Sequence, residues 1–322
     1  MHILPKPPPE DDSLPLPGGA KYKTPEEAAR IYFLPNLFTA GNLFFGFAAI
    51  IRCIQARYVV PDEQVNSFYT DAVWCILLAA FCDALDGRLA RLGGRESLFG
   101  KEFDSIADTV SFGVAPALMV FFLILGPTAE KYFVSVLSLI LGPSAEKYAD
   151  SFQQIGWIVG FVYLLCVGVR LARFNVLTNP LLVGGKAAES KDFMGLPSPA
   201  AAGFVASLVL AMLHLDFTKE TIQQSSILLL PLLLLVALLM VSNIPYPSFK
   251  HVDWQMQTKA RPFILVIIAM AIAYRLREFS FAIFFLCYIF YGLGRYVRRA
   301  WRKKYPSAAD LASPEPEDED AF

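Results

Sequence analysis

Long apolar runs constrain this chain more than any other feature of its sequence. A helix needs about 20 mostly apolar residues to cross the hydrocarbon core of a bilayer. Eight segments meet that description, at about 36–55, 71–91, 104–126, 153–174, 198–215, 225–243, 261–276 and 279–297. In lipid the backbone has to satisfy its own hydrogen bonds, and a helix does so within one segment. The sequence therefore predicts an all-α, polytopic membrane helix bundle with about eight transmembrane helices.

Lysine and arginine are distributed unevenly between the segments that join these runs. The N-terminal segment, every second loop and the C-terminal tail together hold 21 of the 28 basic residues. Basic residues accumulate on the cytoplasmic side of membrane proteins. We therefore expect a multi-pass protein of the inner or cell membrane with both termini in the cytoplasm. No basic face stands out, so nucleic acid is not an expected partner.

Four aspartates lie where the second and third runs approach each other in the sequence. Residues 83–108 read DALDGRLARLGGRESLFGKEFDSIAD. Asp83 and Asp86 are three residues apart and share one face of a helix end, while Asp104 and Asp108 are four apart and share one face of the next. Gly93, Gly94 and Gly100 in the connecting loop let the two helix ends turn toward each other. The four carboxylates are predicted to converge on the cytoplasmic side.

Such a cluster needs cations. One aspartate within a transmembrane helix costs about 2.5–3.5 kcal/mol on insertion scales, and four deeply placed ones cost on the order of 10 kcal/mol. Ligand sets made only of oxygen select hard ions such as Mg²⁺, Mn²⁺ or Ca²⁺. Two such ions can bind a diphosphate and stabilise a leaving oxygen. The alternative is a group of solvated or salt-bridged charges balanced by Arg88, Arg91 and Arg95.

The spacing of these residues resembles a known signature. The pattern Asp83-x2-Asp86-Gly87-x2-Ala90-Arg91-x8-Gly100-x3-Asp104-x3-Asp108 is similar to that of the CDP-alcohol phosphatidyltransferase family at every specified position. The resemblance implies a six-helix core, here with two further helices, and two divalent cations, Mg²⁺ or Mn²⁺. It implies that Asp83, Asp86 and Asp104 are metal ligands. Asp108 would be a ligand and also the catalytic base that deprotonates the acceptor alcohol. Because members of the family are often dimers, it also implies a homodimer.

Small side chains in the pattern have a physical explanation. Gly87 and Ala90 lie one and about two turns beyond Asp83 on the same face, where larger side chains would obstruct a nucleotide. Gly100 would do the same across the cleft, and Arg91 can bind a phosphate oxygen with its fork of donors. We therefore expect these four residues to contact the CDP-lipid. Close packing of helices in lipid would also explain the glycines.

A polar stripe on the first run points to the same site. Asn36, Thr39 and Asn42 follow one another at intervals of three residues and so lie on one side of a helix. We interpret them as contacts to the nucleotide. Hydrogen bonds between helices are the alternative explanation for such residues in a membrane protein.

Four further segments resemble one group within the family. PNLFTAGNLFFGF (35–47), ARFNV (172–176), FMGLPSPAAAG (193–203) and MVSNIPYPSFK (240–250) are similar to segments of membrane-embedded phosphatidylserine synthases. The resemblance implies that CDP-diacylglycerol and L-serine are the substrates, and that phosphatidylserine and CMP are the products. The lipid bilayer would supply the first substrate.

An amino-acid acceptor makes its own chemical demands. The carboxylate of serine favours an arginine as its partner. Arg170 and Arg173 end the fourth run on the cytoplasmic side, and Asn175 follows them. Ser111 lies one turn past Asp108 and is a candidate for the lining of the same cavity. We expect these four residues to bind the acceptor, and anchoring at lipid headgroups is the alternative for the two arginines.

Two other functions stay open at this point. The same chemistry could use glycerol 3-phosphate, an inositol phosphate or an aminoalcohol as acceptor. A membrane transporter could use intramembrane acids as a translocation path. Transporters usually show related halves, and this sequence shows none.

These observations divide the chain into four parts. We expect a disordered N-terminal tail at 1–23, a juxtamembrane amphipathic helix at 24–34, a transmembrane catalytic domain at 35–298 and a cytoplasmic tail at 299–322 that is first basic and then acidic. One duplication interrupts the domain, because LILGPTAEKY (123–132) recurs as LILGPSAEKY (139–148). We expect it to lengthen a loop on the non-cytoplasmic side, and no function follows from it.

Overall fold

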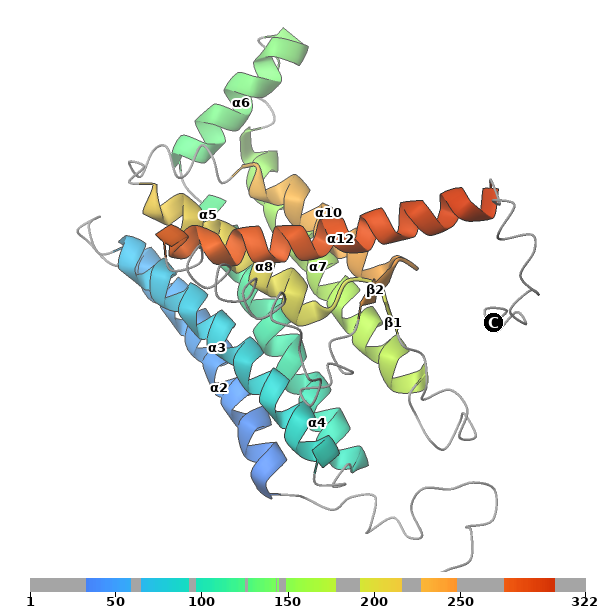
Figure 1. Ribbon diagram of the computed structural model, residues 1–322. Coiled ribbons are helices and arrows are strands. Elements are labelled where there is room, and N and C mark those ends of the chain that lie inside the picture. The colour runs from blue at the N-terminus through green and yellow to red at the C-terminus, as the bar shows by residue number, and fades with distance from the viewer. Residues whose placement is uncertain are drawn as a thin grey trace, which may run out of the picture.

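The computed structural model describes residues 33–58, 65–92, 97–124, 127–142, 144, 149–177, 192–215, 227–247 and 275–304. These parts of the chain are helical except for two three-residue strands and short turns. Figure 1 shows α2 and α3 side by side along one edge of the bundle, and α12 crossing the other helices. The predicted all-α membrane bundle is therefore confirmed.

Five of the described helical segments are long and apolar enough to cross a membrane. They are Phe33–Tyr58, Asn66–Leu89, Leu98–Leu123, Gln154–Leu177 and Phe279–Arg299. Two apolar helices are shorter, α8 (Ser198–His214) and α10 (Leu229–Val241). These seven helical segments match seven of the eight expected runs. The remaining expected run, at 261–276, lies almost entirely outside the described residues. The chain is an integral membrane protein.

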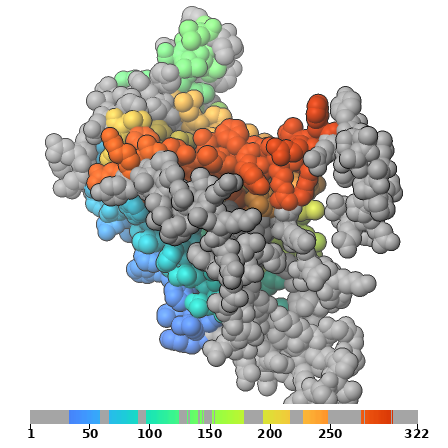
Figure 2. Space-filling model, viewed as in Figure 1, coloured from blue at the N-terminus to red at the C-terminus, as the bar shows by residue number. Residues whose placement is uncertain are grey.

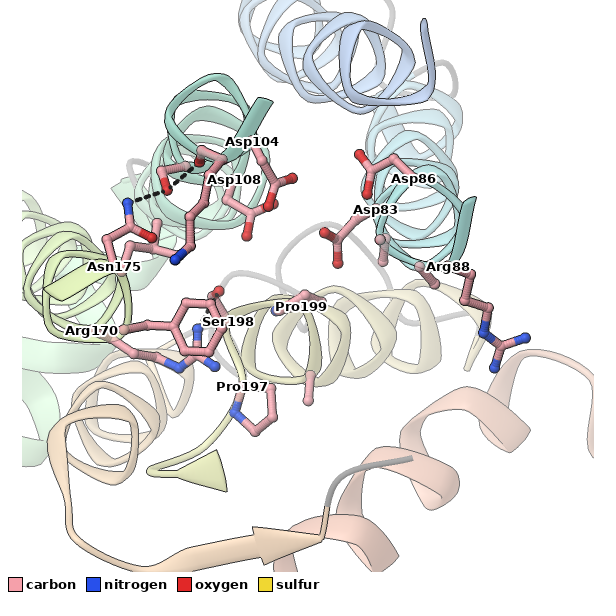
Figure 3. A pocket seen from close by; sticks show the side chains of 18 of the residues that line it. Asp83, Asp86, Arg88, Asp104, Asp108, Arg170, Asn175, Pro197, Ser198 and Pro199 are labelled. Carbon is pink, nitrogen blue, oxygen red and sulfur yellow. Dashed lines mark hydrogen bonds between the residues drawn. The ribbon is translucent and has the colours of Figure 1, made fainter. Parts of the chain in front are cut away.

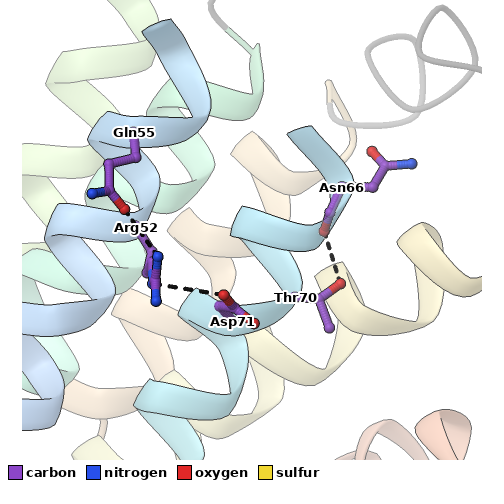
Figure 4. A network of polar contacts seen from close by, with 5 residues as sticks. All are labelled: Arg52, Gln55, Asn66, Thr70 and Asp71. Atoms are coloured by element: carbon purple, nitrogen blue, oxygen red, sulfur yellow. Dashed lines mark hydrogen bonds and ion pairs between the residues drawn. The ribbon is translucent and has the colours of Figure 1, made fainter. Parts of the chain in front are cut away.

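The first two long helices, α2 (Phe33–Tyr58) and α3 (Val65–Leu92), form an antiparallel pair. Their buried positions are mostly small, as at Ala49 and Ala72, which lets the backbones approach in the absence of a hydrophobic driving force between helices. Figure 4 shows the polar contacts near the loop end of this pair. Arg52 Nε lies 3.6 Å from Asp71 Oδ2, and Arg52 also donates to Gln55. This ion pair links α2 to α3.

A second polar contact in Figure 4 belongs to the first turn of α3. Thr70 donates its hydroxyl proton to the carbonyl oxygen of Asn66 at 2.8 Å. This bond stays within one helix, so it stabilises the start of α3 rather than its packing.

The third membrane segment lies at the centre of the bundle. It consists of α4 (Leu98–Asp108), a π-helical turn η3 (Thr109–Val114) and α5 (Ala115–Ile124). In the most apolar stretch of this segment, 61% of the residues are buried. The corresponding share is 28% or less in the other four long segments. It is therefore the helix around which the others pack.

Helix α7 (Ala149–Leu177) runs beside the central helix, and α12 (Glu278–Lys304) crosses over α8. Figure 2 shows α12 as a band across the face that faces the viewer. α12 exposes large apolar side chains, including Phe284, Phe290 and Tyr291. α12 ends at Lys304, so its last turns extend into the part of the chain that we expected to be tail.

Two short strands connect the helices on the side of the aspartates. β1 (Asp192–Met194) pairs antiparallel with β2 (Pro245–Pro247), so that Phe193 lies opposite Tyr246. The chain then turns at Gly195, which has a φ of +79°, and a Cβ there would lie 3.0 Å from the carbonyl carbon of Met240. Only glycine satisfies both conditions. The sequence patterns did not predict this pairing.

Helix α6 (Pro127–Leu141) occupies the region of the duplication, where we expected a loop. A connection between membrane spans can contain a helix, so α6 does not contradict that expectation, and it stays a prediction. Pro127 stands at the first helical position, and Gly142 follows the last one with a φ of +62°. The residues between these two signals include no glycine or proline, so the segment has ordinary helix signals that the repeat had obscured. The described part of the second copy is limited to 139–142 and 144.

Candidate active site

A cavity of about 920 Å³ lies between α3, α4, α7, α12 and the start of α8. Its wall combines apolar side chains with a group of charged and polar ones. The charged and polar side chains of its lining are Asp83, Asp86, Arg88, Lys101, Asp104, Ser105, Asp108, Arg170, Asn175, Ser198 and Tyr288. All four aspartates of the sequence pattern therefore face one cavity.

Three of these aspartates converge closely. Each of Asp83, Asp104 and Asp108 offers a carboxylate oxygen, and the three oxygens lie within 4.8 Å of one another. Figure 3 shows Asp83 on α3 facing Asp104 and Asp108 across the gap between the helices. The Oδ1 atom of Asp104 is buried and has no hydrogen-bond partner among the described residues. Three like charges with an unsatisfied buried oxygen and only oxygen ligands fit a hard divalent cation.

The helix that carries two of these ligands is capped within the same region. Ser97 is the N-cap of α4, and its hydroxyl oxygen accepts a hydrogen bond from the backbone N–H of Gly100 at 3.1 Å. A Cβ on Gly100 would lie 3.7 Å from Asn36 Oδ1. That distance is an ordinary van der Waals contact, and the tighter neighbour is Ser97 Oγ at 3.3 Å, so the approach of α2 does not by itself require a glycine here.

The fourth aspartate is held differently. Asp86 is 5% exposed and lies outside the group of three. Its Oδ2 atom accepts a hydrogen bond from the hydroxyl of Thr39 at 2.8 Å. Asp86 and Gly87 both line the cavity. Ala90 and Arg91 belong to α3, but their side chains lie outside the described residues.

Two residues of the polar stripe on α2 form hydrogen bonds to aspartates from outside the cavity. Besides the bond from Thr39 to Asp86, Asn42 donates from Nδ2 to Asp108 Oδ1 at 3.0 Å. Ser111 in turn donates to the backbone carbonyl of Asn42 at 2.9 Å. Thr39, Asn42 and Ser111 are buried and do not line the cavity. Their described hydrogen bonds orient carboxylates or link helices, and contact with a nucleotide or acceptor stays a prediction for them.

The two arginines at the end of α7 lie in different places. Arg170 lines the cavity, donates from Nη1 to Ser198 Oγ at 2.9 Å, and has a buried Nε without a partner among the described residues. Arg173 is exposed and is not part of the lining. Both of its terminal nitrogens donate to Asn243 Oδ1 at 3.1 Å. Nη2 also donates to Met194 Sδ at 3.2 Å, so its described contacts join α7 to β1 and to the turn before β2.

Asn175 lies in the cavity wall between these groups. It donates from Nδ2 to Ser105 Oγ at 2.9 Å, and Figure 3 shows this contact beside Asp104 and Asp108. It thus links the end of α7 to the central helix.

Several lining residues were not among our sequence candidates. Ser198 follows Pro197 at the start of the fifth apolar run, on the same side as the aspartates, and that position was a usable signal. Lys101 lies within the aspartate pattern, and its Nζ is 5.9 Å from the ring centre of Phe174. Tyr288 reaches the cavity because α12 crosses the bundle, and no local pattern predicts such a crossing.

Comparison with known proteins agrees with this site. Residues 32–242 match the family model described as CDP-alcohol phosphatidyltransferase. A Helicobacter pylori protein (strain J99) named CDP-diacylglycerol–serine O-phosphatidyltransferase is 32% identical over 267 residues, which cover 83% of this chain and 92% of that protein. An archaetidylserine synthase of Methanothermobacter thermautotrophicus is 32% identical over 66% of this chain and 69% of its own. A Saccharomyces cerevisiae protein with the same name as the Helicobacter one is 35% identical over 53% of this chain and 51% of its own. With its aspartates gathered in one cavity and these matches over most of its length, the chain belongs to the CDP-alcohol phosphatidyltransferase family.

Proposed function

We propose that this protein transfers the phosphatidyl group of CDP-diacylglycerol to L-serine and produces phosphatidylserine and CMP. Family membership and the names of the relatives support the reaction class and the acceptor. The observation that carries the choice of acceptor is Arg170. Arg170 lines the same cavity as the three converging aspartates, and its buried Nε has no partner among the described residues. A small acceptor with a carboxylate would supply that partner.

The aspartates are the proposed metal ligands. Asp83, Asp104 and Asp108 would hold two divalent cations, Mg²⁺ or Mn²⁺, together with Asp86 from the neighbouring turn of α3. When bound, such ions neutralise the diphosphate of the lipid and the charge that develops on the leaving nucleotide. Lys101 and Arg88 also line the cavity and add positive charge near its charged end.

Asp108 is the proposed base. Asn42 fixes one of its carboxylate oxygens, which leaves the other to accept the proton of the serine hydroxyl. The serine oxygen then forms a bond to the phosphorus that bears diacylglycerol, and the bond from that phosphorus to CMP breaks. The proton stays on Asp108 until solvent removes it. Most of the rate would come from positioning and electrostatic stabilisation, as in phosphoryl transfer generally.

The acceptor would lie between α7 and the start of α8. Ser198 holds Nη1 of Arg170, so the guanidinium is oriented before the acceptor arrives. Asn175 and Ser105 flank the same space. Arg173 was an acceptor candidate too, but its described bonds support a structural role, and we assign the carboxylate to Arg170.

The CDP-lipid would lie on the other side of the aspartates. Gly87 leaves room beside Asp83 and Asp86, and we keep Ala90, Arg91 and Gly100 as proposed contacts on the grounds of the family pattern. We also propose that this end of the bundle, and both termini, face the cytoplasm, with residues 35–298 as the catalytic domain. The uneven distribution of basic residues supports that orientation.

The experiment is a CMP-release assay with purified protein. CDP-diacylglycerol is incubated with Mg²⁺ or Mn²⁺ and a panel of acceptors that includes L-serine, glycerol 3-phosphate and an aminoalcohol. We expect release that depends on L-serine and that stops when a chelator is added. Release with another acceptor would keep the family chemistry and overturn serine. Absence of release with every acceptor, from protein shown to be folded, would overturn the proposed function.

A further inference from the structure

Pro116 interrupts the central helix just after the catalytic region. Proline has no backbone N–H, so it cannot donate to the carbonyl of the residue four positions earlier, and its ring also crowds that carbonyl. Here that residue is Phe112, which is buried. The helix responds with the π turn at Thr109–Val114, whose end is marked by the N–H of Ala115 donating to the carbonyl of Val110. Such turns relieve helix strain and are frequent at functional sites.

A tyrosine from α7 supplies the missing donor. The hydroxyl of Tyr163 donates to the carbonyl oxygen of Phe112 at 2.9 Å, and Tyr163 is completely buried. Within a membrane, a carbonyl freed by proline has to be satisfied by a neighbouring helix or by water. Tyr163 therefore supplies a donor to the carbonyl that position 116, as a proline, cannot satisfy.

This hydrogen bond acts close to the aspartates. Asp108 is the residue immediately before the π turn. On the opposite side of the turn, Ser111 is bonded to the backbone of Asn42, whose side chain holds Asp108. The turn is thus fixed from α2 on one side and from α7 on the other.

Helix α7 forms a second hydrogen bond to the central helix. Asn175 donates to Ser105, and Tyr163 donates to Phe112, so two hydrogen bonds from α7 lie on either side of Arg170 along that helix. Hydrogen bonds between helices stabilise their association in lipid together with close packing. The register of α7 decides whether Arg170 faces the cavity that contains Asp108.

We propose that Tyr163 is a positioning residue for the reaction. It replaces the N–H that Pro116 lacks, holds the π turn behind Asp108, and with Asn175 sets the register of Arg170. The inference rests on the proposed function for the role of Asp108 and Arg170. It does not require Tyr163 to touch either substrate.

The first test is Tyr163→Phe, which removes the hydroxyl and keeps the ring. Leaving a buried carbonyl unsatisfied is expected to lower kcat about tenfold. The concentrations of Mn²⁺ and of L-serine that give half-maximal CMP release should both rise, because Asp108 and Arg170 lose their fixed positions. The KM for CDP-diacylglycerol should change little. Tyr246→Phe is the matched control, since Tyr246 is equally buried and its hydroxyl has no partner in the described part of the chain.

The second test is a double-mutant cycle with Pro116→Ala, which restores an N–H four residues after Phe112. In the Pro116→Ala background, Tyr163→Phe should lower kcat much less than it does in the unchanged protein. It should also cause a smaller decrease in the temperature at which half of the detergent-solubilised protein unfolds. If Tyr163→Phe alone does not fold, the double variant should recover folded protein. An equal loss in both backgrounds, or a double variant that also fails to fold, would overturn the proposal. So would a Tyr163→Phe variant with normal kcat and normal half-saturation for Mn²⁺ and serine.

The parallel assay of the unchanged protein separates this inference from the proposed function. If that protein released no CMP with any acceptor, the reaction would be wrong, while the unfolding temperatures of the cycle would still report on the bond between Tyr163 and Phe112. Additive unfolding temperatures in an active enzyme would leave the function standing and overturn the role of Tyr163.

Discussion

The side-chain amide of Asn42 donates a hydrogen bond to Asp108 at 3.0 Å, across 66 residues of sequence. The bond joins α2 to the central helix and fixes one oxygen of a carboxylate that is 5% exposed. It therefore orients the proposed base before any substrate binds.

Loss of this hydrogen bond should affect kcat for CMP release more than it affects the stability of the fold. We expect Asn42→Ala to reduce kcat for CMP release by about tenfold or more, because a charged hydrogen bond contributes about 1.5–3 kcal/mol. Asn42→Asp should be worse, since it places a second negative charge against Asp108. The measurement is kcat with saturating L-serine and CDP-diacylglycerol.

Thr39→Val is the companion variant, because it removes the equivalent hydrogen bond to Asp86 and keeps the shape of the side chain. Its main effect is expected on the metal concentration that gives half-maximal activity. If both variants behaved like the unchanged protein, the stripe on α2 would have no part in orienting the carboxylates.

Replacement of the proposed base tests whether proton removal by Asp108 can be separated from metal binding by the other aspartates. Asp108→Asn should lower kcat by about 10² to 10⁴, the usual contribution of general base catalysis. Binding of Mn²⁺, followed by its paramagnetic resonance signal, should persist in weakened form because Asp83 and Asp104 are unchanged. Near-normal turnover in this variant would assign proton removal to another group.

The two arginines of α7 should separate in a kinetic comparison. Arg170→Ala should raise the KM for L-serine about tenfold to a hundredfold, as expected for the loss of a charged hydrogen bond at the acceptor carboxylate. The KM for CDP-diacylglycerol should rise much less. Arg173→Ala should lower the unfolding temperature, because its bonds to Asn243 hold a turn, and should leave the serine KM close to normal. Equal increases in both KM values for Arg170→Ala would move that residue to the phosphate.

The convergence of the aspartates could be anticipated from the sequence because it depends on local spacing. Intervals of three and four residues place carboxylates on one face of a helix, and the glycines between the pairs allow the chain to turn. The structure brings Asp83, Asp104 and Asp108 together, whereas Asp86, which the sequence placed with them, lies outside this group. Positions of the long apolar helices followed from length and composition in the same way.

Other parts of the site depend on contacts that no local pattern encodes. Thr39 and Asn42 were recognised as a polar stripe, but whether such a stripe meets ligand or protein is decided by the rotation of α2 against its neighbours. The pairing of β1 with β2 joins segments more than 40 residues apart, and it shapes the start of α8. Tyr288 enters the cavity only because α12 crosses the bundle. These features arise from tertiary packing.

Gly46 provides a test of that packing without changing any polar group. A Cβ on Gly46 would lie 2.7 Å from the Cα atom of Ser111, which is closer than real side chains come to a neighbouring backbone. Gly46→Ala should therefore push α2 away from the π turn and destabilise the protein by about 1–3 kcal/mol, the usual cost of overpacking a core.

The matched control is Gly168→Ala on α7, where a Cβ would meet nothing within 4 Å. It should be neutral or slightly stabilising, because alanine restricts the unfolded chain more than glycine does. The unfolding temperature in detergent measures both effects, and CMP release shows whether the displaced helix also disturbs Asp108. Because Ser111 bonds to Asn42 and Asn42 to Asp108, Gly46→Ala should also lower kcat. A Gly46→Ala variant as stable and active as Gly168→Ala would mean that α2 and the π turn are not packed as closely as described.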